Sequence, residues 1–357
     1  MQAFEAGHEQ VIMREDVHTG LRAIIALHST VLGPAAGGCR HWVYANPAAA
    51  LDDALRLSQG MTFKNALADI PFGGGKSVIL GTPGERLSTR QLETFGRWVD
   101  ELGGRYVTAE DVGIHVADMR VIARTTRFVS GLGTATGLGG DPSPRTAEGV
   151  LYGIEAAVRT RFGADSLAGI RVAIQGLGNV GFHLATLLNQ RGARLWVADI
   201  ADDRVRRAVK GLGAEALSVD DVLTADVDVV APCALGGAID HRTACALRAP
   251  IVAGAANNQL ASDDMGDLLS ERGVLYAPDY VINAGGVISV AGEYLGKEDP
   301  AWVDSRIAGI GERLQAIFER AAGSGEATSR IADQLARERL ARAARDDLRG
   351  NGGRAVA

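Results

Sequence analysis

The sequence predicts an α/β protein of two domains, and three observations lead to this fold class. Its 357 residues exceed the usual size of a single domain. In the second half, short apolar runs alternate with helical segments, as in a doubly wound parallel sheet. Between the halves lies SGLGTATGLGGDPSPRTAEG, the longest glycine- and proline-rich stretch of the chain. Such a composition favours a loop and hinge, so we place the domain boundary near residue 140.

The first half predicts a mixture of strands and helices. Two apolar stretches between about Gln10 and Leu27 flank an HTG turn and predict a β-hairpin. Asn46, as N-cap, and Pro47, at the first helical position, begin a helix that Pro71 stops. The remaining expected elements are strands at KSVIL and RYVTAED and helices over about 92–102 and 117–129.

The second half predicts the parallel sheet. A helix capped by Ser143 begins at Pro144 and runs to about Phe162. Runs that are apolar almost throughout then predict strands buried on both faces. They are RVAIQ, RLWVADI, VDVVAPCA, IVAGAANN and VLYAPDYVIN. Helical patterns follow over about 304–322 and 328–348.

Composition argues against several classes of function. A formal charge of -6 is unlike a nucleic-acid-binding protein, which needs a basic face. No apolar stretch approaches the roughly 18 residues of a membrane span, and the opening MQAFEAGHEQ is too polar for a secretory signal. The cysteines Cys39, Cys233 and Cys245 form no CxxC pair. We therefore expect a cytoplasmic protein with no metal, no nucleic-acid partner and no membrane association.

A dinucleotide site is predicted in the second half. Gly176, Gly178 and Gly181 form G-x-G-x-x-G directly between an apolar strand and an amphipathic helix. These glycines permit the tight turn, the approach of a pyrophosphate and close helix packing. The helix N-terminus would hold the phosphates. The next strand ends in Asp199, at the spacing for a ribose diol, and an acid there favours NAD over NADP. The second half is therefore interpreted as a Rossmann-type nicotinamide domain.

The stretch DIPFGGGKSVIL raises the question of what three glycines do before Lys76. It is not a phosphate-binding P-loop, because Ile70 stands where the first glycine of that motif belongs and a strand follows rather than a helix. Taken alone, Lys76 is more typical of a solvated lysine than of a catalytic one. The neighbouring motifs favour a catalytic interpretation.

Several groups are expected to converge with Lys76. Lys64 lies near the end of the helix that leads into this turn, and Asp111 follows the strand in TAEDVG. Gly38, in LGPAAGGCR, offers a bare backbone. Two lysines, a carboxylate and free amides would bind a small carboxylate and manage protons. Exclusion of water by glycines would favour the neutral amine that a general base requires.

These motifs together resemble a known family. GPAAGGCR, MTFKNA, PFGGGKSVI, TAEDVG with VADM, GDPSPRTA, GLGNVG, APCALGGAI, GAANNQ and YAPDYVINAGGVI occur here in the family's order. They are similar to the leucine, valine and phenylalanine dehydrogenases of the glutamate dehydrogenase superfamily, over about residues 11–295. The resemblance implies a substrate-binding domain over 1–140, joined by C-terminal helices of about 328–357, and an NAD-binding domain over 141–327.

The resemblance also implies roles for matched residues. Lys64 would pair with the substrate α-carboxylate, helped by the backbone near Gly38, while Lys76 would activate water and Asp111 would exchange protons with the substrate nitrogen. Asn283 would hold the carboxylate or amine from the opposite domain. Further cofactor contacts are implied for Thr146, Asn179, Val180, Ala234 and Asn257, beside the three glycines and Asp199.

The substrate is expected to be an apolar L-amino acid, deaminated reversibly to its 2-oxo acid and ammonia. Ala36 matches the aromatic-specific enzymes of the family, whereas Val287 and Val290 match the branched-chain type. These signals conflict, so leucine or valine is the first expectation and phenylalanine or another aromatic residue the second. A catalytically silent NAD-binding sensor is the alternative of another class. The resemblance further implies a homo-oligomer.

Overall fold

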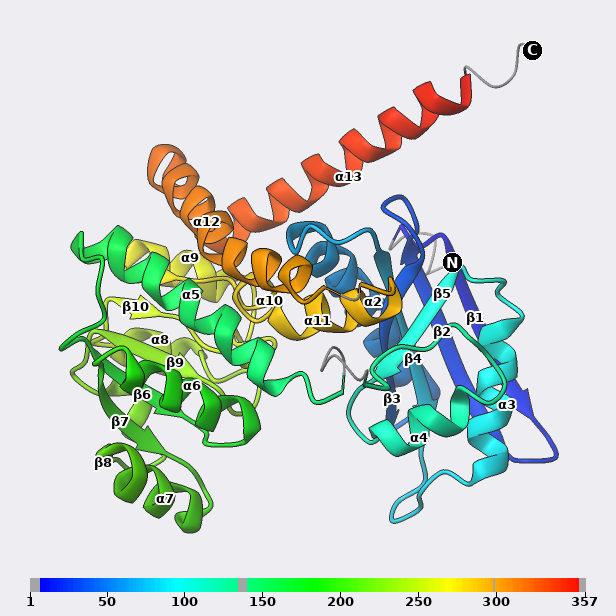
Figure 1. The fold of residues 1–357 in the computed structure, drawn as a ribbon, viewed down its shortest axis with the longest axis horizontal. Helices are drawn as coiled ribbons and strands as arrows, with labels where there is room; N and C mark the ends of the chain where they lie inside the picture. The colour runs from blue at the N-terminus through cyan, green and yellow to red at the C-terminus, as the bar shows by residue number, and fades with distance from the viewer. Residues whose placement is uncertain (1–6, 134–139, 298, 353–357) are drawn as a thin grey trace. The chain divides into compact units, whose positions relative to one another are not determined.

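The computed structural model describes residues 7–133, 140–297 and 299–352 (Figure 1). The chain forms two compact units. The first unit runs to Asp141 and also takes Val290–Pro300 and the chain from Ala336 onward. The second comprises Pro142–Ser289 and Ala301–Leu335. Two features were not expected from the sequence, namely the assignment of 290–300 to the first unit and the return of the chain to that unit at Ala336 instead of 328.

The first unit contains a five-stranded mixed sheet in the order β1-β2-β4-β3-β5. Its strands are β1 (Gln10–Asp16), β2 (Leu21–Ser29), β3 (Ala35–Trp42), β4 (Gly73–Leu80) and β5 (Tyr106–Glu110). The predicted hairpin is confirmed, since β1 and β2 pair antiparallel from Gln10–Leu27 to Asp16–Leu21. Strand β4 lies antiparallel to β2, whereas β4, β3 and β5 run parallel. Strand β3, inserted between β4 and β5, was not predicted.

Helices cover both faces of this sheet. Helix α2 (Pro47–Leu67) begins as predicted, with the Asn46 side chain accepting a hydrogen bond from the Ala49 amide. It packs Ala54 and Leu55 on Ile24 and other residues of one sheet face. Helices α3 (Thr89–Asp100) and α4 (Val116–Ile122) cover the opposite face. Helix α4 is shorter than the predicted 117–129, because the chain returns to the sheet at Val129, which bridges to Thr108 of β5.

The three glycines before Lys76 are part of strand β4 and do not form the turn that the sequence suggested. A Cβ on Gly73 would lie 1.9 Å from the carbonyl oxygen of Ser29, and one on Gly74 would lie 2.1 Å from the backbone nitrogen of Thr62. A Cβ on Gly75 would lie 2.9 Å from the Tyr106 ring. The glycines therefore admit strand β2, helix α2 and an aromatic ring at contact distances that no side chain permits.

The second unit contains a six-stranded, wholly parallel sheet in the order β11-β10-β9-β6-β7-β8. The order reverses beside β6, which confirms the predicted doubly wound α/β class. The strands are β6 (Arg171–Gln175), β7 (Arg194–Ala198), β8 (Glu215–Ala216), β9 (Val229–Pro232), β10 (Ile251–Val252) and β11 (Leu275–Tyr276). Ala173, Val230 and Val252 belong to its buried core.

The remaining helices follow the predicted alternation. They are α5 (Ser143–Phe162), α6 (Asn179–Gln190), α7 (Asp202–Leu212), α8 (His241–Ala246), α9 (Asp264–Glu271), α10 (Asp279–Ile282), α11 (Gly285–Tyr294), α12 (Ala301–Ser324) and α13 (Thr328–Gly352). Ser143 is the first residue of α5, which Pro142 caps, so the predicted Ser143 cap was wrong. The predicted strand VLYAPDYVIN stops at Tyr276, and α10 begins directly after Pro278.

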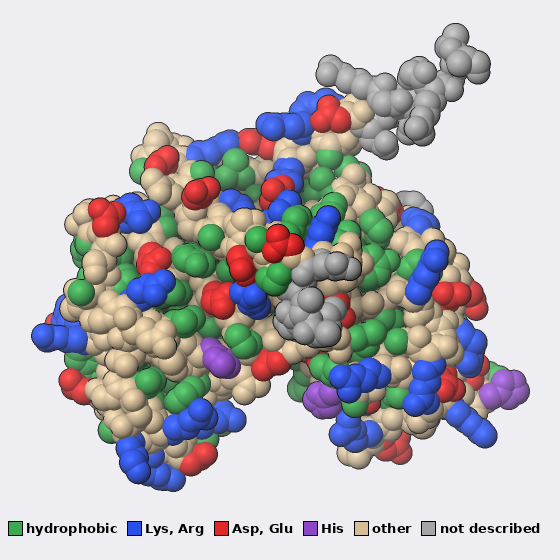
Figure 2. Space-filling model, viewed as in Figure 1, with side chains coloured by type: hydrophobic (Ala, Val, Ile, Leu, Met, Phe, Trp, Pro, Cys, Tyr) green, Lys and Arg blue, Asp and Glu red, His purple; other side chains and the backbone are tan. Residues whose placement is uncertain are grey.

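Two properties of the surface bear on the expected partners. Among the described residues, no helix combines the length and apolarity that crossing a bilayer requires. On the face drawn in Figure 2, basic and acidic side chains are interspersed. Residues 134–139 of the predicted hinge lie outside the described residues.

The close contact between β4 and α2 predicts a large cost for a small substitution. Gly74→Ala should lower the free energy of unfolding by about 1–3 kcal/mol, because the new methyl group forces α2 away from the sheet. Gly60→Ala is the matched control, since Gly60 lies in α2 with nothing within 4 Å of its Cβ position. That control should stabilise by about 0.5–1 kcal/mol. Urea unfolding measures both, and equal effects of the two substitutions would contradict the packing argument.

Candidate active site

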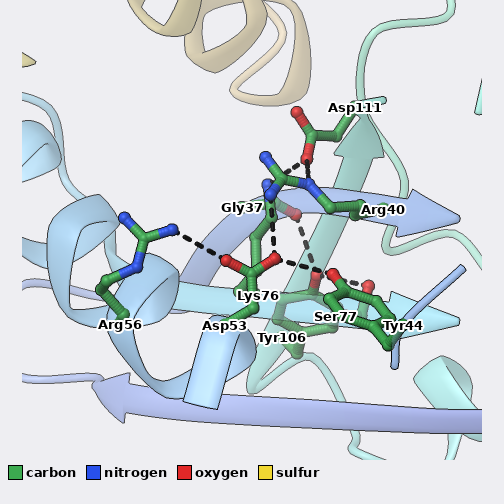
Figure 3. A network of polar contacts seen from close by, with 9 residues as sticks. All are labelled: Gly37, Arg40, Tyr44, Asp53, Arg56, Lys76, Ser77, Tyr106 and Asp111. Atoms are coloured by element: carbon green, nitrogen blue, oxygen red, sulfur yellow. Dashed lines mark hydrogen bonds and ion pairs between the residues drawn. The ribbon is translucent and has the colours of Figure 1, made fainter. Parts of the chain in front are cut away.

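The first unit holds a buried ion pair between Lys76 and Asp111. The Lys76 Nζ donates to Asp111 Oδ2 at 2.6 Å (Figure 3). The Lys76 side chain is only 6% exposed and that of Asp111 is 24% exposed. An ammonium this deeply buried needs a partner charge, and the carboxylate provides it.

Glycine 38 makes this pairing possible. Lys76 projects from β4, whereas Asp111 follows the end of β5, and β3 lies between these two strands. A Cβ on Gly38 of β3 would lie 2.7 Å from the Glu110 carbonyl oxygen and 2.8 Å from the Asp111 Cβ. A side chain at this position would therefore displace Asp111. Gly38, predicted as a substrate contact, has a clear packing role beside the ion pair.

The same carboxylate has a second cationic partner that the sequence analysis missed. Arg40 Nε donates to Asp111 Oδ2 at 3.0 Å, and Arg40 Nη1 donates to Asp53 Oδ2 at 2.9 Å. Burial alone would raise the pKa of Asp111, but the positive charges of Lys76 and then Arg40 outweigh it and hold that pKa below its usual range. The sequence did offer a signal for Arg40. Side chains alternate between the two faces of a strand, and Arg40 stands two residues after Gly38, so both lie on the same face.

Below the ion pair, a buried phenol fixes the backbone of β3. Tyr106 Oη donates to the Gly37 carbonyl at 2.9 Å and lies 3.0 Å from Ser77 Oγ (Figure 3). Tyr106 is fully buried, and burial raises its pKa, so the hydroxyl stays neutral and keeps its proton as a donor. This contact links three neighbouring strands under the Gly37–Gly38 segment.

The other predicted residues of the first unit lie on the two elements that flank this pair. Lys64 is a half-buried residue in the last turn of α2. The backbone of that helix packs on Gly74, two residues before Lys76. Ala36 is half-buried in β3, paired with Gly74 on one side and Val107 on the other, and it shares the strand face of Gly38. No group of ligands suited to a metal ion occurs among the described residues.

The glycine turn of the second unit has a geometry suited to the pyrophosphate of a dinucleotide. Gly176 has a φ of 93°, which favours glycine. A Cβ on Gly181 would lie 2.0 Å from the Gly176 carbonyl oxygen, so this glycine lets α6 approach the turn. Gly178 caps α6 and has open space at its Cβ position. The first-turn N–H groups of Asn179 and Val180 have no helical acceptors, so this end of α6 can receive a phosphate.

The acid that follows the second parallel strand is already engaged with this turn. Asp199 Oδ2 accepts a hydrogen bond from the Leu177 amide at 2.6 Å, and Oδ1 accepts one from the Ala201 amide at 2.8 Å. The Asp199 side chain is 5% exposed and lies 3.5 Å from Arg204. Burial alone would raise its pKa, but these donors lower it, so the group is an anion. Oδ1, which bonds the Ala201 amide, retains one lone pair for a ribose hydroxyl.

The remaining predicted residues of the second unit occupy its loops and helix starts. Ala234 packs against the turn, because a Cβ placed on Gly176 would lie 2.8 Å from the Cβ of Ala234. Thr146 Oγ1 donates to the Pro142 carbonyl at 2.9 Å in the first turn of α5. Asn283 Nδ2 donates to Asn257 Oδ1 at 2.8 Å, and the Asn283 Oδ1 is buried with no hydrogen-bond partner among the described residues. That amide oxygen can therefore accept a hydrogen bond from a ligand.

The two predicted valines lie on helix α11. Val287 and Val290 are three residues apart, so they share one helix face, and both are half-buried. Glu293, on the same helix as Val290, accepts hydrogen bonds from the Gly131 and Leu132 amides. These contacts secure the start of the loop that leads to residue 133.

Comparison with known proteins identifies the family. The model of the Glu/Leu/Phe/Val dehydrogenase dimerisation domain matches residues 7–128, and the Glutamate/Leucine/Phenylalanine/Valine dehydrogenase model matches 140–203 and 197–346. The chain is 47% identical to leucine dehydrogenase of Bacillus subtilis, covering 94% of this chain and 92% of that protein. Valine dehydrogenase of Streptomyces albus is 46% identical, with 95% and 94% covered.

A solved structure supports the same assignment. L-tryptophan dehydrogenase from Nostoc punctiforme superimposes with a TM-score of 0.86 at 41% identity, covering 96% of this chain and 99% of that one. The chain therefore belongs to the Glu/Leu/Phe/Val dehydrogenase family and is an amino-acid dehydrogenase, as its motifs predicted.

The ion pair predicts a specific dependence of stability on pH. Asp111→Asn should cost about 1–3 kcal/mol near neutral pH, because it leaves the Lys76 ammonium opposite a neutral amide. The folded pKa of Asp111 lies below its ordinary 3.8, so the carboxylate stabilises fully above that value and progressively less as pH falls through the folded pKa. The difference between wild type and variant should therefore shrink below about pH 4.

Urea unfolding between about pH 3 and 7 measures this difference. The control is Asp52→Asn, which removes an exposed carboxylate from α2 and should change stability by less than about 0.5 kcal/mol. A difference for Asp111→Asn that stays constant down to about pH 3 would show that the ion pair does not act as described.

Proposed function

We propose that this chain catalyses the NAD-dependent, reversible oxidative deamination of an apolar L-amino acid to its 2-oxo acid and ammonia. The observation that carries the proposal is the 2.6 Å contact between Lys76 and Asp111, a buried amine beside a half-buried acid. An acid whose pKa is held below its usual range by an adjacent amine is typical of sites that transfer protons. Membership of the amino-acid dehydrogenase family supports this use of the pair.

The second unit is proposed to bind NAD. The amides of Asn179 and Val180 at the start of α6 would hold the pyrophosphate, with Gly178 leaving room for its approach. Asp199 would accept a hydrogen bond from the ribose. Thr146, Ala234 and Asn257 would line the rest of the cofactor's path, Thr146 next to the nicotinamide amide. When bound, NAD accepts the hydride that leaves the substrate Cα.

Lys76 and Asp111 divide the remaining proton transfers. Loss of a hydride from Cα and of a proton from nitrogen converts the amine to an imine. Asp111 accepts the proton that the nitrogen loses. Lys76 accepts a proton from the water that attacks the imine carbon, and Asp111 returns its proton to the nitrogen, which gives the carbinolamine. When the carbinolamine collapses, its hydroxyl proton passes to the nitrogen by way of Asp111, so that the 2-oxo acid forms, ammonia leaves, and the proton on Lys76 is the one released. The same groups serve the reverse reaction. Two transfers in sequence need two groups within hydrogen-bond distance, which this pair supplies.

Substrate binding is proposed for three further groups. The Lys64 ammonium would pair with the α-carboxylate, because α2 carries it on the same side of the sheet as Lys76. The backbone near Gly38 would add amide donors. Asn283, with its unpaired buried Oδ1, would accept a hydrogen bond from the substrate amine.

The side chain of the substrate is proposed to be branched and aliphatic. Leucine and valine dehydrogenases are similar to this chain along almost its whole length, which favours this class. The tryptophan enzyme of Nostoc punctiforme, at 41% identity, favours an aromatic substrate as the alternative. Ala36 is the residue that favours the aromatic substrate, since its small side chain would enlarge the pocket for the substrate side chain. The match to a dimerisation domain supports a homo-oligomer.

Removing the lysine amine tests the proposal directly. Lys76→Ala should lower kcat by about 10³-fold or more, because it removes the amine that accepts a proton from the attacking water, while NADH binding, followed by fluorescence, stays unchanged. The assay follows NADH absorbance at alkaline pH across a panel of L-amino acids and simple amines. A Lys76→Ala variant with wild-type turnover would refute the role of Lys76. Wild-type protein that binds NADH but turns over no amino acid would favour the silent sensor instead.

Ala36 predicts which amino acids the enzyme accepts. Ala36→Leu should reduce kcat/KM for phenylalanine and tryptophan relative to leucine by about 10–200-fold, because the added bulk shrinks the pocket. The ratio of kcat/KM values is the measurement. Ala48→Leu, at an exposed position of α2, is the control and should leave the ratio unchanged. An unchanged ratio in Ala36→Leu would remove Ala36 from the side-chain pocket.

A further inference from the structure

Arg40 connects two carboxylates that come from different parts of the first unit. It projects from β3, its side chain is 22% exposed, and it donates to both Asp111 and Asp53. Its Nε bonds Asp111 Oδ2 at 3.0 Å and its Nη1 bonds Asp53 Oδ2 at 2.9 Å. A planar guanidinium can make two such bonds in fixed directions, which a lysine ammonium cannot reproduce.

The far end of this bridge is itself anchored. Asp53, on α2, accepts a hydrogen bond from the Tyr44 hydroxyl at 2.7 Å and one from Arg56 at 2.8 Å (Figure 3). Burial alone would raise the pKa of Asp53, but the hydroxyl of Tyr44 and the charge of Arg40 lower it, so this carboxylate is an anion. Asp53 thus fixes the direction of the Arg40 guanidinium.

Both cations bind the same oxygen of Asp111. Lys76 Nζ and Arg40 Nε both contact Oδ2, whereas Oδ1 accepts no hydrogen bond from any residue that the structure describes. Figure 3 shows this second oxygen turned away from Lys76 and Arg40. The arrangement leaves one carboxylate oxygen available to a ligand and keeps the other occupied.

The charges of this cluster explain why two cations are needed. When Lys76 is neutral, it no longer balances Asp111, and a solitary buried carboxylate would take up a proton. Arg40 remains positive at every accessible pH. It can therefore hold Asp111 as an anion whenever Lys76 is neutral, so that Asp111 is ready to accept the proton of the substrate nitrogen.

We propose that Arg40 is a positioning residue, which keeps Asp111 ionised between its proton transfers and keeps its Oδ1 directed at the substrate nitrogen while Lys76 gains and loses a proton. This inference rests on the proposed deamination chemistry and assigns to Arg40 no contact with the substrate. Arg40 acts through Asp111, and Asp53 with Tyr44 acts through Arg40.

Other charged or titratable groups surround this pair, and none of them can replace Arg40. Arg56 reaches Asp53 only, by the opposite oxygen, and its side chain is 57% exposed. Glu110, next to Asp111, is an acid whose pKa is raised by burial and by Asp141. The remaining groups that interact with this cluster or with Glu110 are Cys39, Tyr44, Tyr106, His115 and Asp118, and the last turn of α2 carries Lys64.

Steady-state kinetics of three variants test this role. Arg40→Gln should lower kcat with L-leucine about 10²-fold with less than about a threefold change in KM, because orientation is lost and substrate contacts are not. The acid limb of the kcat/KM profile should move to higher pH by about one unit, since removal of a nearby cation makes protons of the pair harder to lose. Arg40→Lys should restore part of the lost kcat and should move the acid limb most of the way back to its wild-type pH.

Arg56→Gln is the matched control, because it removes a cation from the same Asp53 without touching Asp111. Its pH profile should equal that of wild type. An Arg40→Gln profile identical to wild type would overturn the inference. So would a loss of kcat in Arg40→Gln with no pH shift and no recovery in Arg40→Lys, which is the behaviour of a merely structural residue.

A second measurement is independent of turnover. In protein labelled with ¹³C at the aspartate carboxyls, the Asp111 signal is the one missing from Asp111→Asn. Its titration midpoint should rise by about one unit or more in Arg40→Gln, and an unchanged midpoint would overturn the inference. If wild-type protein turns over no amino acid, the proposed function fails while this titration still decides whether Arg40 holds Asp111 ionised.

Discussion

The site depends on one buried ion pair formed across an intervening strand. Lys76 on β4 and Asp111 beyond β5 meet at 2.6 Å only because β3, which separates their strands, carries glycine at position 38. Removal of a lysine from water is costly, and the carboxylate offsets that cost. The pair is thus both a constraint on the fold of the first unit and the chemical feature on which the proposed reaction relies.

Glycines create the necessary space in both units. In the first, Gly74 lets α2 pack on the strand that carries Lys76, and Gly38 admits Asp111. In the second, Gly181 lets α6 approach the Gly176 turn, and Asp199 closes that turn by accepting from the Leu177 amide. At these positions glycine therefore permits close backbone contacts at the places where ligands are proposed to bind.

Much of this could be predicted from the sequence, because the decisive signals were local. The G-x-G-x-x-G turn, the Asn46 cap and the alternation of strands and helices act within a few residues. Partners distant in sequence were harder to foresee. Arg40 and Asp53 meet only after α2 packs on the sheet, and Gly73–Gly75 read as a turn because their strand contacts come from elsewhere in the chain. The roles assigned to individual site residues stay predictions.

A double-mutant cycle on Lys76 and Asp111 tests the central claim most directly. The quantity measured is kcat/KM for L-leucine in wild type, Lys76→Ala, Asp111→Asn and the double variant, with NADH binding as the check on folding. If the two groups work as one unit, the double variant should be about as impaired as the worse single variant. Losses that multiply in full would mean that the two residues act independently, and would contradict a shared role of the ion pair in proton transfer.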